Sequence, residues 1–149
     1  MDWKDFNIEQ INTPNETIKN SLKGFEKATK GLLRLSLFEK SDMERMRKKY
    51  APSFQYDLIL HSPYMPNYKF DVLELLYEVT LYPCSLVLEN GIEDELGINP
   101  FEKSLQLQNE EELKLTLEKI FSTKRFESIV SGLMKITSVS KLEDEDFPF

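Results

Sequence analysis

The residues best suited to chemistry stand at the end of the sequence, where an acidic run closes on Phe-Pro-Phe. They are Glu143, Asp144, Glu145, Asp146, Phe147, Pro148 and Phe149. The ring of Phe149 can enter an apolar pocket while its α-carboxylate pairs with an arginine or lysine at the rim. Pro148 restricts the backbone and so lowers the entropy lost on docking. The acidic side chains favour a basic partner surface, and salt should weaken this attraction. We therefore expect these residues to form a partner-docking peptide.

These residues resemble the C-terminal tail of bacterial single-stranded DNA-binding proteins, in which aspartates and a hydrophobic residue precede a terminal Pro-Phe. Asp146 matches the last acidic position and Phe147 the hydrophobic one. Two glutamates replace commoner aspartates, and Phe147 replaces the more usual isoleucine or leucine. In that family the tail recruits replication, repair and recombination enzymes, including helicases, exonucleases, primase and a uracil glycosylase. The resemblance covers seven residues and implies a shared kind of docking pocket, but not that residues 1–140 bind DNA.

An acidic terminus also has two simpler interpretations. It can serve solubility, or its final phenylalanine can fold back onto the body of the protein. The ordered combination of acidic run, aromatic residue and Pro-Phe at the terminus favours docking. A peptide this short binds weakly by itself, so tight recruitment requires a second contact or several copies.

A basic run followed by aromatic residues is the second candidate site. Its members are Arg45, Arg47, Lys48, Lys49 and Tyr50, and Lys124-Arg125 would extend it if the fold brings them near. Such a surface could grip the phosphate backbone of single-stranded DNA and stack its bases. The alternative is a solvated helix end, with cations that suit the helix dipole, before a strand whose Phe54 and Tyr56 face the core.

The other reactive side chains lack a recognisable catalytic pattern. His61 has no Ser-His-Asp order around it, so we expect a structural or surface histidine. Cys84 lies in an apolar segment, which predicts a buried and inert thiol. Asp71, Glu74 and Glu78 would share one face of a helix, either as metal-binding carboxylates or as a solvated face. The five glycines form no phosphate-binding loop, so the sequence supports neither an enzyme nor a cofactor.

Composition narrows the class of protein further. The 149 residues suffice for one domain, and the tail accounts for four of the seven net negative charges, which leaves −3 for the rest. Any nucleic-acid surface is therefore a local patch. One cysteine and one histidine exclude an intramolecular disulfide and a zinc cluster. No signal peptide or apolar membrane span is visible, so we expect a cytoplasmic protein.

Local patterns predict the elements of the first half. Residues 1–12 form an arm that Trp3, Phe6, Ile8 and Ile11 could pin to the body. A Thr13–Glu16 capping box opens a helix that Gly31 suits as a stop. Alternating apolar residues predict strands at 33–37 and 54–60, with a short helix from Ser41 between them and a break at 62–67.

Residues 68–82 fit either a helix buried on nearly all sides or a strand, and Glu74 and Glu78 make us favour the helix. The remaining expected elements are a strand at 85–88, a turn at Asn90-Gly91, a loop at 92–100, a short edge strand at 105–107, and helices beginning at Asn109 and at Ser122 or Thr123. From Thr137 onward the helical periodicity fades into a polar connector.

We therefore expect a single α/β or α+β domain over residues 1–137, with a small mixed sheet of three or four strands covered by helices. Residues 138–149 would form a flexible acidic tail. The leading functional hypothesis is a non-enzymatic accessory protein of DNA replication, repair or recombination, from a bacterium or a phage, that docks onto proteins which bind single-stranded DNA-binding protein tails. The alternative is a small acidic inhibitor or immunity-type protein that covers a basic partner surface with carboxylates such as Glu93, Asp94 and Glu95.

Overall fold

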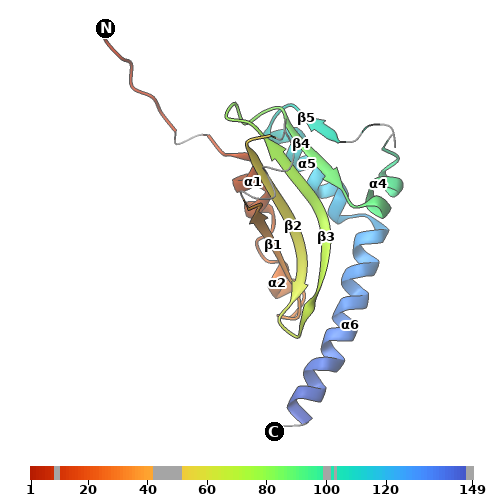
Figure 1. The fold of residues 1–149 in the computed structure, drawn as a ribbon. Helices are drawn as coiled ribbons and strands as arrows, with labels where there is room; N and C mark the ends of the chain where they lie inside the picture. The colour runs from red at the N-terminus through yellow and green to blue at the C-terminus, as the bar shows by residue number, and fades with distance from the viewer. Residues whose placement is uncertain (9–10, 42–51, 99–101, 103, 147–149) are drawn as a thin grey trace.

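Helices flank a run of strands that are consecutive in the chain. The structure, a computed structural model, describes residues 1–8, 11–41, 52–98, 102 and 104–146, and of residues 143–146 it describes the backbone. The elements are α1 (Pro14–Ser21), α2 (Phe25–Ala28), β1 (Arg34–Glu39), β2 (Phe54–Ser62), β3 (Met65–Tyr77), β4 (Cys84–Leu88), α4 (Asn90–Leu96), β5 (Leu105–Leu107), α5 (Glu110–Phe121) and α6 (Lys124–Asp146). Together they form one mixed α/β domain (Figure 1).

The sheet has the order β1-β2-β3-β4-β5, and each strand is antiparallel to its neighbours. The predicted fold class is confirmed, with five antiparallel strands in place of three or four in a mixed sheet. Because every strand pairs with the next one along the chain, β1 and the three-residue β5 are left as the two edges.

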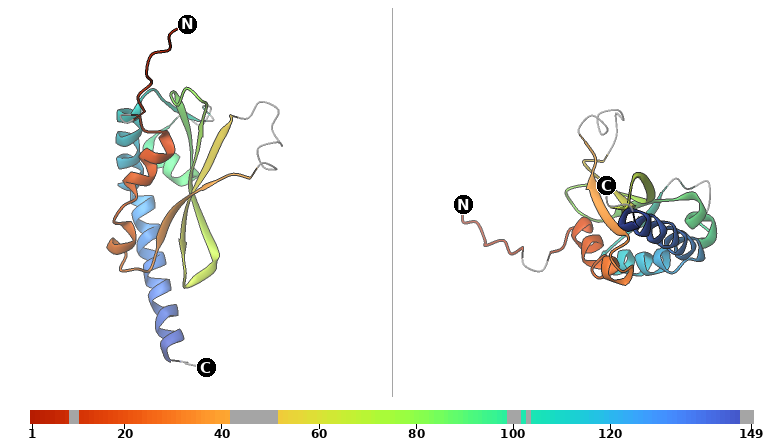
Figure 2. Two further views of the ribbon diagram at one scale, coloured as in Figure 1. Left: turned by 90° about the vertical axis from the view of Figure 1, so that its left-hand side faces the viewer. Right: turned by 90° about the horizontal axis from the view of Figure 1, so that it is seen from below.

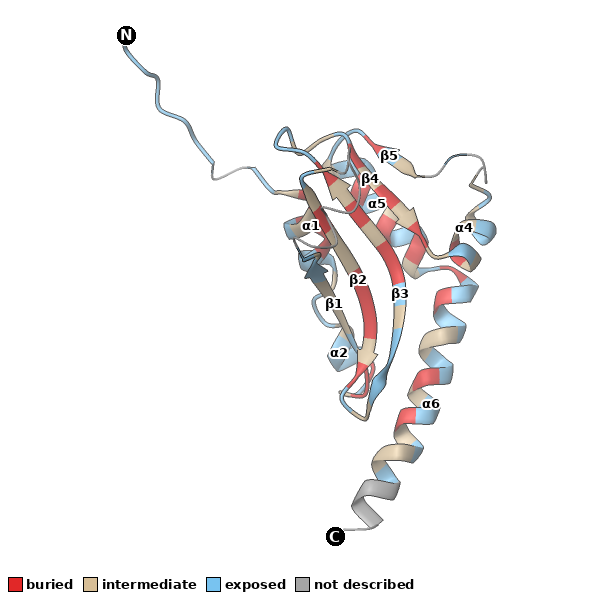
Figure 3. Cartoon of the chain, in the orientation of Figure 1, coloured by how far each residue is buried: buried red, intermediate tan, exposed pale blue. Residues whose placement is uncertain are grey.

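The helices α1, α2, α5 and α6 lie on one face of the sheet, and the core lies between the two layers (Figure 2). Its fully buried members are Ile18, Leu33, Leu58, Leu60, Val72, Leu75, Cys84, Leu86, Ile92, Leu113 and Ile120. Figure 3 shows the buried positions concentrated on β2, β3 and β4 and along one side of α6. The opposite face of the sheet carries no helix among the described residues.

The favoured helix over 68–82 is wrong, because residues 65–77 form the long strand β3. Leu73 pairs with Leu58, whereas Asp71 pairs with Ile59, so Val72 is an extra residue in a β-bulge. The bulge shifts the alternation by one position, and Val72 and Leu73 are both buried. Because the bulge interrupts the two-residue alternation, the apolar residues of this strand are spaced as in a helix that is buried on nearly all sides.

The first helix begins as predicted but ends earlier. Thr13 Oγ1 accepts the N–H of Glu16 at 3.3 Å, and Glu16 Oε1 accepts the N–H of Thr13 at 3.2 Å, which confirms the capping box. Gly24, with φ of 89°, separates α1 from the short α2, so the helical pattern does not run through to Gly31.

The predicted turn at Asn90-Gly91 and the loop after it are also wrong, since these residues open helix α4. Glu89 caps this helix by accepting the N–H of Ile92 at 2.9 Å. A Cβ on Gly91 would lie 2.5 Å from Arg125 Nε. The glycine therefore permits close approach of the Arg125 side chain and does not mark a turn.

The C-terminal half follows the sequence pattern more closely. The edge strand β5 is confirmed, and Asn109 Oδ1 accepts the N–H of Glu112 at 2.9 Å at the start of α5. Thr123 Oγ1 accepts the N–H of Phe126 at 3.1 Å and so caps α6. The short helix predicted from Ser41 lies outside the described residues.

The arm at the N-terminus is not pinned to the body by its large apolar residues. Trp3, Phe6 and Ile8 are 75%, 70% and 78% exposed. The arm extends away from the domain at the beginning of α1 (Figures 1 and 2).

Candidate functional site

Helix α6 carries the predicted docking peptide, and its first turn is anchored to α4. The Glu95 carboxylate accepts the backbone N–H groups of Lys124 at 2.7 Å and Arg125 at 2.9 Å. A negatively charged hydrogen-bond acceptor is favourable at a helix N-terminus, where the first N–H groups have no intrahelical partner. Glu95, one of the carboxylates predicted to contact a partner, therefore has a structural role in joining α4 to α6.

The middle of α6 packs on the domain almost to its acidic end. Leu133 and Thr137 are buried, and Lys141 Nζ lies 5.6 Å from the ring centroid of Tyr64, near the β2–β3 turn. Val139 and Leu142 are 42% and 58% exposed. The polar connector predicted from Thr137 is instead helical up to Asp146. Figure 1 shows this last part of α6 extending past the β2–β3 hairpin.

The structure places the predicted docking residues in two groups. Glu143, Asp144, Glu145 and Asp146 belong to the end of α6, whereas Phe147, Pro148 and Phe149 lie outside the described residues. The division into a domain of residues 1–137 and a flexible tail of residues 138–149 stays a prediction.

The basic candidate site is Arg45, Arg47, Lys48, Lys49 and Tyr50, and all five lie outside the described residues. Of the aromatic residues that follow, Phe54 stacks on Tyr77 with ring centroids 5.1 Å apart, and Tyr56 does so at 6.1 Å. These rings pack against the core from the helix-covered face. They are therefore not available as a platform for bases.

Arg125, one of the two cations considered as an extension of the basic site, is paired with Glu89. Its Nη2 lies 2.6 Å from Glu89 Oε1, and its guanidinium carbon lies 5.9 Å from the centroid of Phe70. Burial acts to raise the pKa of Glu89, but the hydrogen bonds from Arg125 and from the N–H groups of Ile92 and Gly91 outweigh it and lower that pKa. Arg125 thus links α6 to the cap of α4.

The helix-free face of the sheet holds a polar cluster that the sequence did not reveal. Lys40 Nζ lies 2.8 Å from Glu74 Oε2 and 3.7 Å from Asp57 Oδ1. Glu74 and Asp57 are directly opposite in the β2–β3 register, where two like charges repel unless a cation lies between them. Lys40 therefore neutralises carboxylates that strand pairing forces together.

Next to this cluster is a concavity of about 530 Å³. Its lining includes Phe38, Asp57, Ile59, His61, Tyr68 and Asp71. The helical face predicted to carry Asp71, Glu74 and Glu78 does not exist, because this segment is a strand. The bulge places Asp71 and Glu74 on the same face of β3, whereas Glu78 accepts hydrogen bonds from Ser53. No cluster of three metal-ligating side chains occurs in the part of the chain that the structure describes.

His61 and Ser36 face each other across β1 and β2, with 2.8 Å between Ser36 Oγ and His61 Nε2. Burial, followed by the charge of Arg34, lowers the pKa of His61 from 6.5. Within the described ranges no carboxylate hydrogen-bonds to the other ring nitrogen. The pair therefore lacks the third member that would orient a general base.

Cys84 is fully buried, as predicted, and burial raises the pKa of its thiol to about 11. The thiol is consequently protonated near neutral pH and a poor nucleophile.

A comparison with known protein families, curated protein sequences and solved structures finds no match, so functional inference rests on the residues of this chain. Among the helices within the described ranges, none combines the length and apolar character needed to cross a bilayer.

Proposed function

We propose that this chain is a non-enzymatic accessory protein of DNA replication, repair or recombination. It acts in the bacterial cytoplasm and comes from a bacterium or from a phage. It docks onto partner proteins through Glu143–Phe149, using the chemistry of a single-stranded DNA-binding protein tail. The supporting observation is the course of α6, which packs on the body as far as Lys141 and then carries acidic residues past the β2–β3 hairpin.

The partner surface would combine an apolar pocket with a rim of arginine or lysine. The rim would pair with the carboxylates, and the pocket would receive an aromatic ring. A helical support limits the conformations open to the peptide before binding, and so reduces the entropy lost on docking. Contact between the body and single-stranded DNA is a separate part of the hypothesis that depends on Arg45, Arg47, Lys48, Lys49 and Tyr50.

The test is competition for a purified exonuclease that binds the tail of a bacterial single-stranded DNA-binding protein. The full chain, with Phe149 as its last residue, should displace an immobilised tail peptide, as measured by surface plasmon resonance. Deleting Phe149 should weaken displacement at least tenfold, because the ring and its adjacent carboxylate are both lost from their sites. Raising the salt concentration should weaken displacement by the intact chain.

Asp144→Asn is the matched variant, since it removes one charge and keeps the aromatic end. It should weaken displacement less than the Phe149 deletion, and mainly at low salt. Circular dichroism must show an unchanged fold for both variants. Equal displacement by the full chain and by the Phe149 deletion would reject the docking function.

The helix-free face supports the second candidate, an acidic inhibitor. Asp71 is exposed beside the concavity, and no helix among the described residues covers this face. In that case Asp71→Asn, or Glu93→Gln on α4, should reduce capture of a basic partner, whereas deletion of Phe149 should not. Glu95 is a poor probe because it caps α6.

A further inference from the structure

The N-terminal arm presents apolar side chains that its own domain does not cover. Phe6 and Ile8 are 70% and 78% exposed, and Trp3 is 75% exposed. Residues 1–8 have no helical or strand assignment, and the arm points away from the body (Figure 2). Phe6 and Ile8 are two positions apart, so in an extended chain both side chains project from the same face. This is the pattern of a strand that lacks its sheet.

The edge strand β1 offers unpaired backbone groups. The N–H of Lys40 donates to the carbonyl of Gln55 at 2.9 Å, and hydrogen-bonded pairs alternate along an antiparallel ladder. The peptide groups of Leu35 and Leu37 therefore point away from β2. No strand of the described chain pairs with them, since β2 is the only neighbour of β1 in the sheet.

The beginning of this edge is already closed by a side chain. Thr29 Oγ1 accepts the N–H of Leu33 at 3.3 Å and donates to the carbonyl of Leu33 at 3.1 Å. A further strand could therefore pair with β1 only beyond Leu33, at Leu35 and Leu37.

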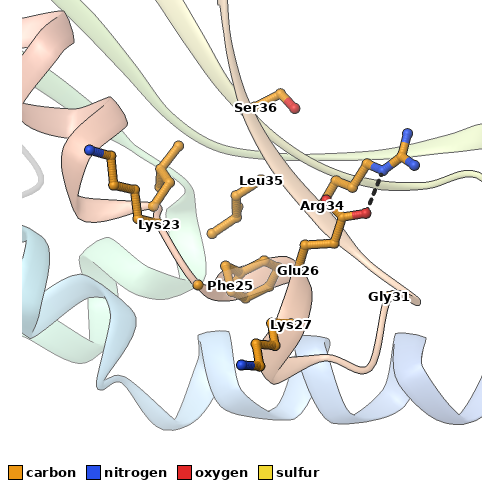
Figure 4. A pocket seen from close by; sticks show the side chains of 10 residues that line it. Lys23, Phe25, Glu26, Lys27, Gly31, Arg34, Leu35 and Ser36 are labelled. Carbon is orange, nitrogen blue, oxygen red and sulfur yellow. Dashed lines mark hydrogen bonds and ion pairs between the residues drawn. The ribbon is translucent and has the colours of Figure 1, made fainter.

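A pocket of about 590 Å³ lies beside Leu35 (Figure 4). Leu22, Phe25 and Leu35 supply its apolar lining. Lys23 and Lys27 also line it, while Arg34 is paired with Glu26 at 3.2 Å. An edge strand next to an apolar pocket is the arrangement that captures an added strand: the backbone supplies hydrogen bonds, and the pocket receives alternate side chains.

We propose that the N-terminal arm of a second copy of this chain adds to the free edge of β1. Phe6 enters the pocket at Phe25 and Leu35, and Ile8 projects to the same side. Asp2 and Lys4 also lie on this face of the extended arm, and the pocket lining carries Lys23, Lys27 and Glu26, so charges of both signs can pair between arm and pocket. Exchange of the two arms produces a symmetric dimer.

A second copy is favoured over the chain's own arm by the direction of the arm. The arm joins α1 at its N-terminal end and points away from the domain, whereas the pocket lies beyond the C-terminal end of α1, at residues 22–27 (Figure 2). Two exchanged arms, each burying Phe6, Ile8 and the backbone that pairs with β1, would cover on the order of 1,000 Å². This is the size at which specific interfaces begin.

The first experiment measures mass by light scattering over a range of protein concentrations. The full chain should dimerise, and a chain lacking residues 1–8 should be monomeric. Phe6→Ala should weaken dimerisation at least tenfold. Val79→Ser is the matched control, because Val79 is 77% exposed and lies outside both surfaces, so it should leave the dimer intact. A monomeric full chain, or a dimer that survives loss of the arm, would overturn the proposal.

The second experiment identifies which copy contributes the arm. Chains carrying Phe6→Cys are mixed with chains carrying Lys27→Cys under mild oxidation, and a mixed disulfide dimer is expected. Cys84 will not interfere, since it is fully buried. A protein with both substitutions that forms only a concentration-independent internal disulfide would show that the arm binds its own edge, which contradicts exchange. Absence of cross-links at both Phe6→Cys and Ile8→Cys would also contradict it.

Discussion

The two faces of the sheet differ in the interactions that their side chains make: burial dominates on one face, and specific polar contacts occur on the other. On the helix-covered face, Leu58, Leu60 and Leu75 are fully buried, and their role is to exclude water. On the other face, Ile59 is buried but its neighbours in the strand, Asp57 and His61, make specific polar contacts. Burial thus explains the three leucines of the first face. The second depends on pairwise interactions, so it is more informative about function.

The largest expected effect compares adjacent residues of β2 that point to opposite faces. Leu60→Ala should lower the free energy of unfolding by about 2–5 kcal/mol, because it leaves a cavity within the core. Ile59→Ala should cost less than Leu60→Ala, because Ile59 borders the 530 Å³ concavity, which water can enter. Urea unfolding followed by circular dichroism measures both. Equal losses would show that the two faces are equally packed.

An intermediate effect is expected at the polar cluster. Lys40→Met removes the cation that lies between the opposed carboxylates of Asp57 and Glu74, and should cost about 1 kcal/mol at low salt. Added salt should restore part of this loss. Lys114→Met on α5 serves as the reference for an exposed ion pair. Lys114 pairs with Glu110 one helical turn away, and its side chain is 51% exposed. Combining Lys40→Met with Glu74→Gln should recover stability, and failure to do so would reject the neutralising role of Lys40.

The smallest effect concerns pH. The pKa of His61 is lowered in the folded protein, so the unfolded chain takes up a proton first as the pH falls. The free energy of unfolding should therefore be unaffected by His61 above about pH 6.5 and should decrease as the pH falls from there through the lowered pKa. His61→Gln should remove this component. His61 is the single histidine, so its NMR titration is unambiguous, and a midpoint at or above 6.5 would contradict the burial of its ring.

The sequence predicted elements whose signals are local. The caps at Thr13, Asn109 and Thr123 depend on residues three positions apart, and all three are present in the structure. The errors occurred where a distant partner decides. Val72 is a bulge because of its pairing with β2, and a glycine stands at position 91 because Arg125 leaves no room for a Cβ there. Neither relation is visible in a window of adjacent residues.

The candidate sites divide in the same way. The docking peptide is a contiguous pattern, so the sequence was sufficient to propose it, and it stays a prediction. The contact of Lys40 with Asp57 and Glu74 joins the residue after β1 to β2 and β3, so the strand register is needed to find it. Glu95 looked like a surface carboxylate because its partners, the first N–H groups of α6, are 29 and 30 residues away.

The position of Trp3 has a practical consequence for spectroscopy. It is the single tryptophan of the chain, and it is 75% exposed on the arm. Selectively excited indole fluorescence should therefore change little when the domain denatures, so it is a poor reporter of global unfolding. A blue shift of that emission would instead signal that the indole has left water, which turns the tryptophan into a built-in probe of the arm.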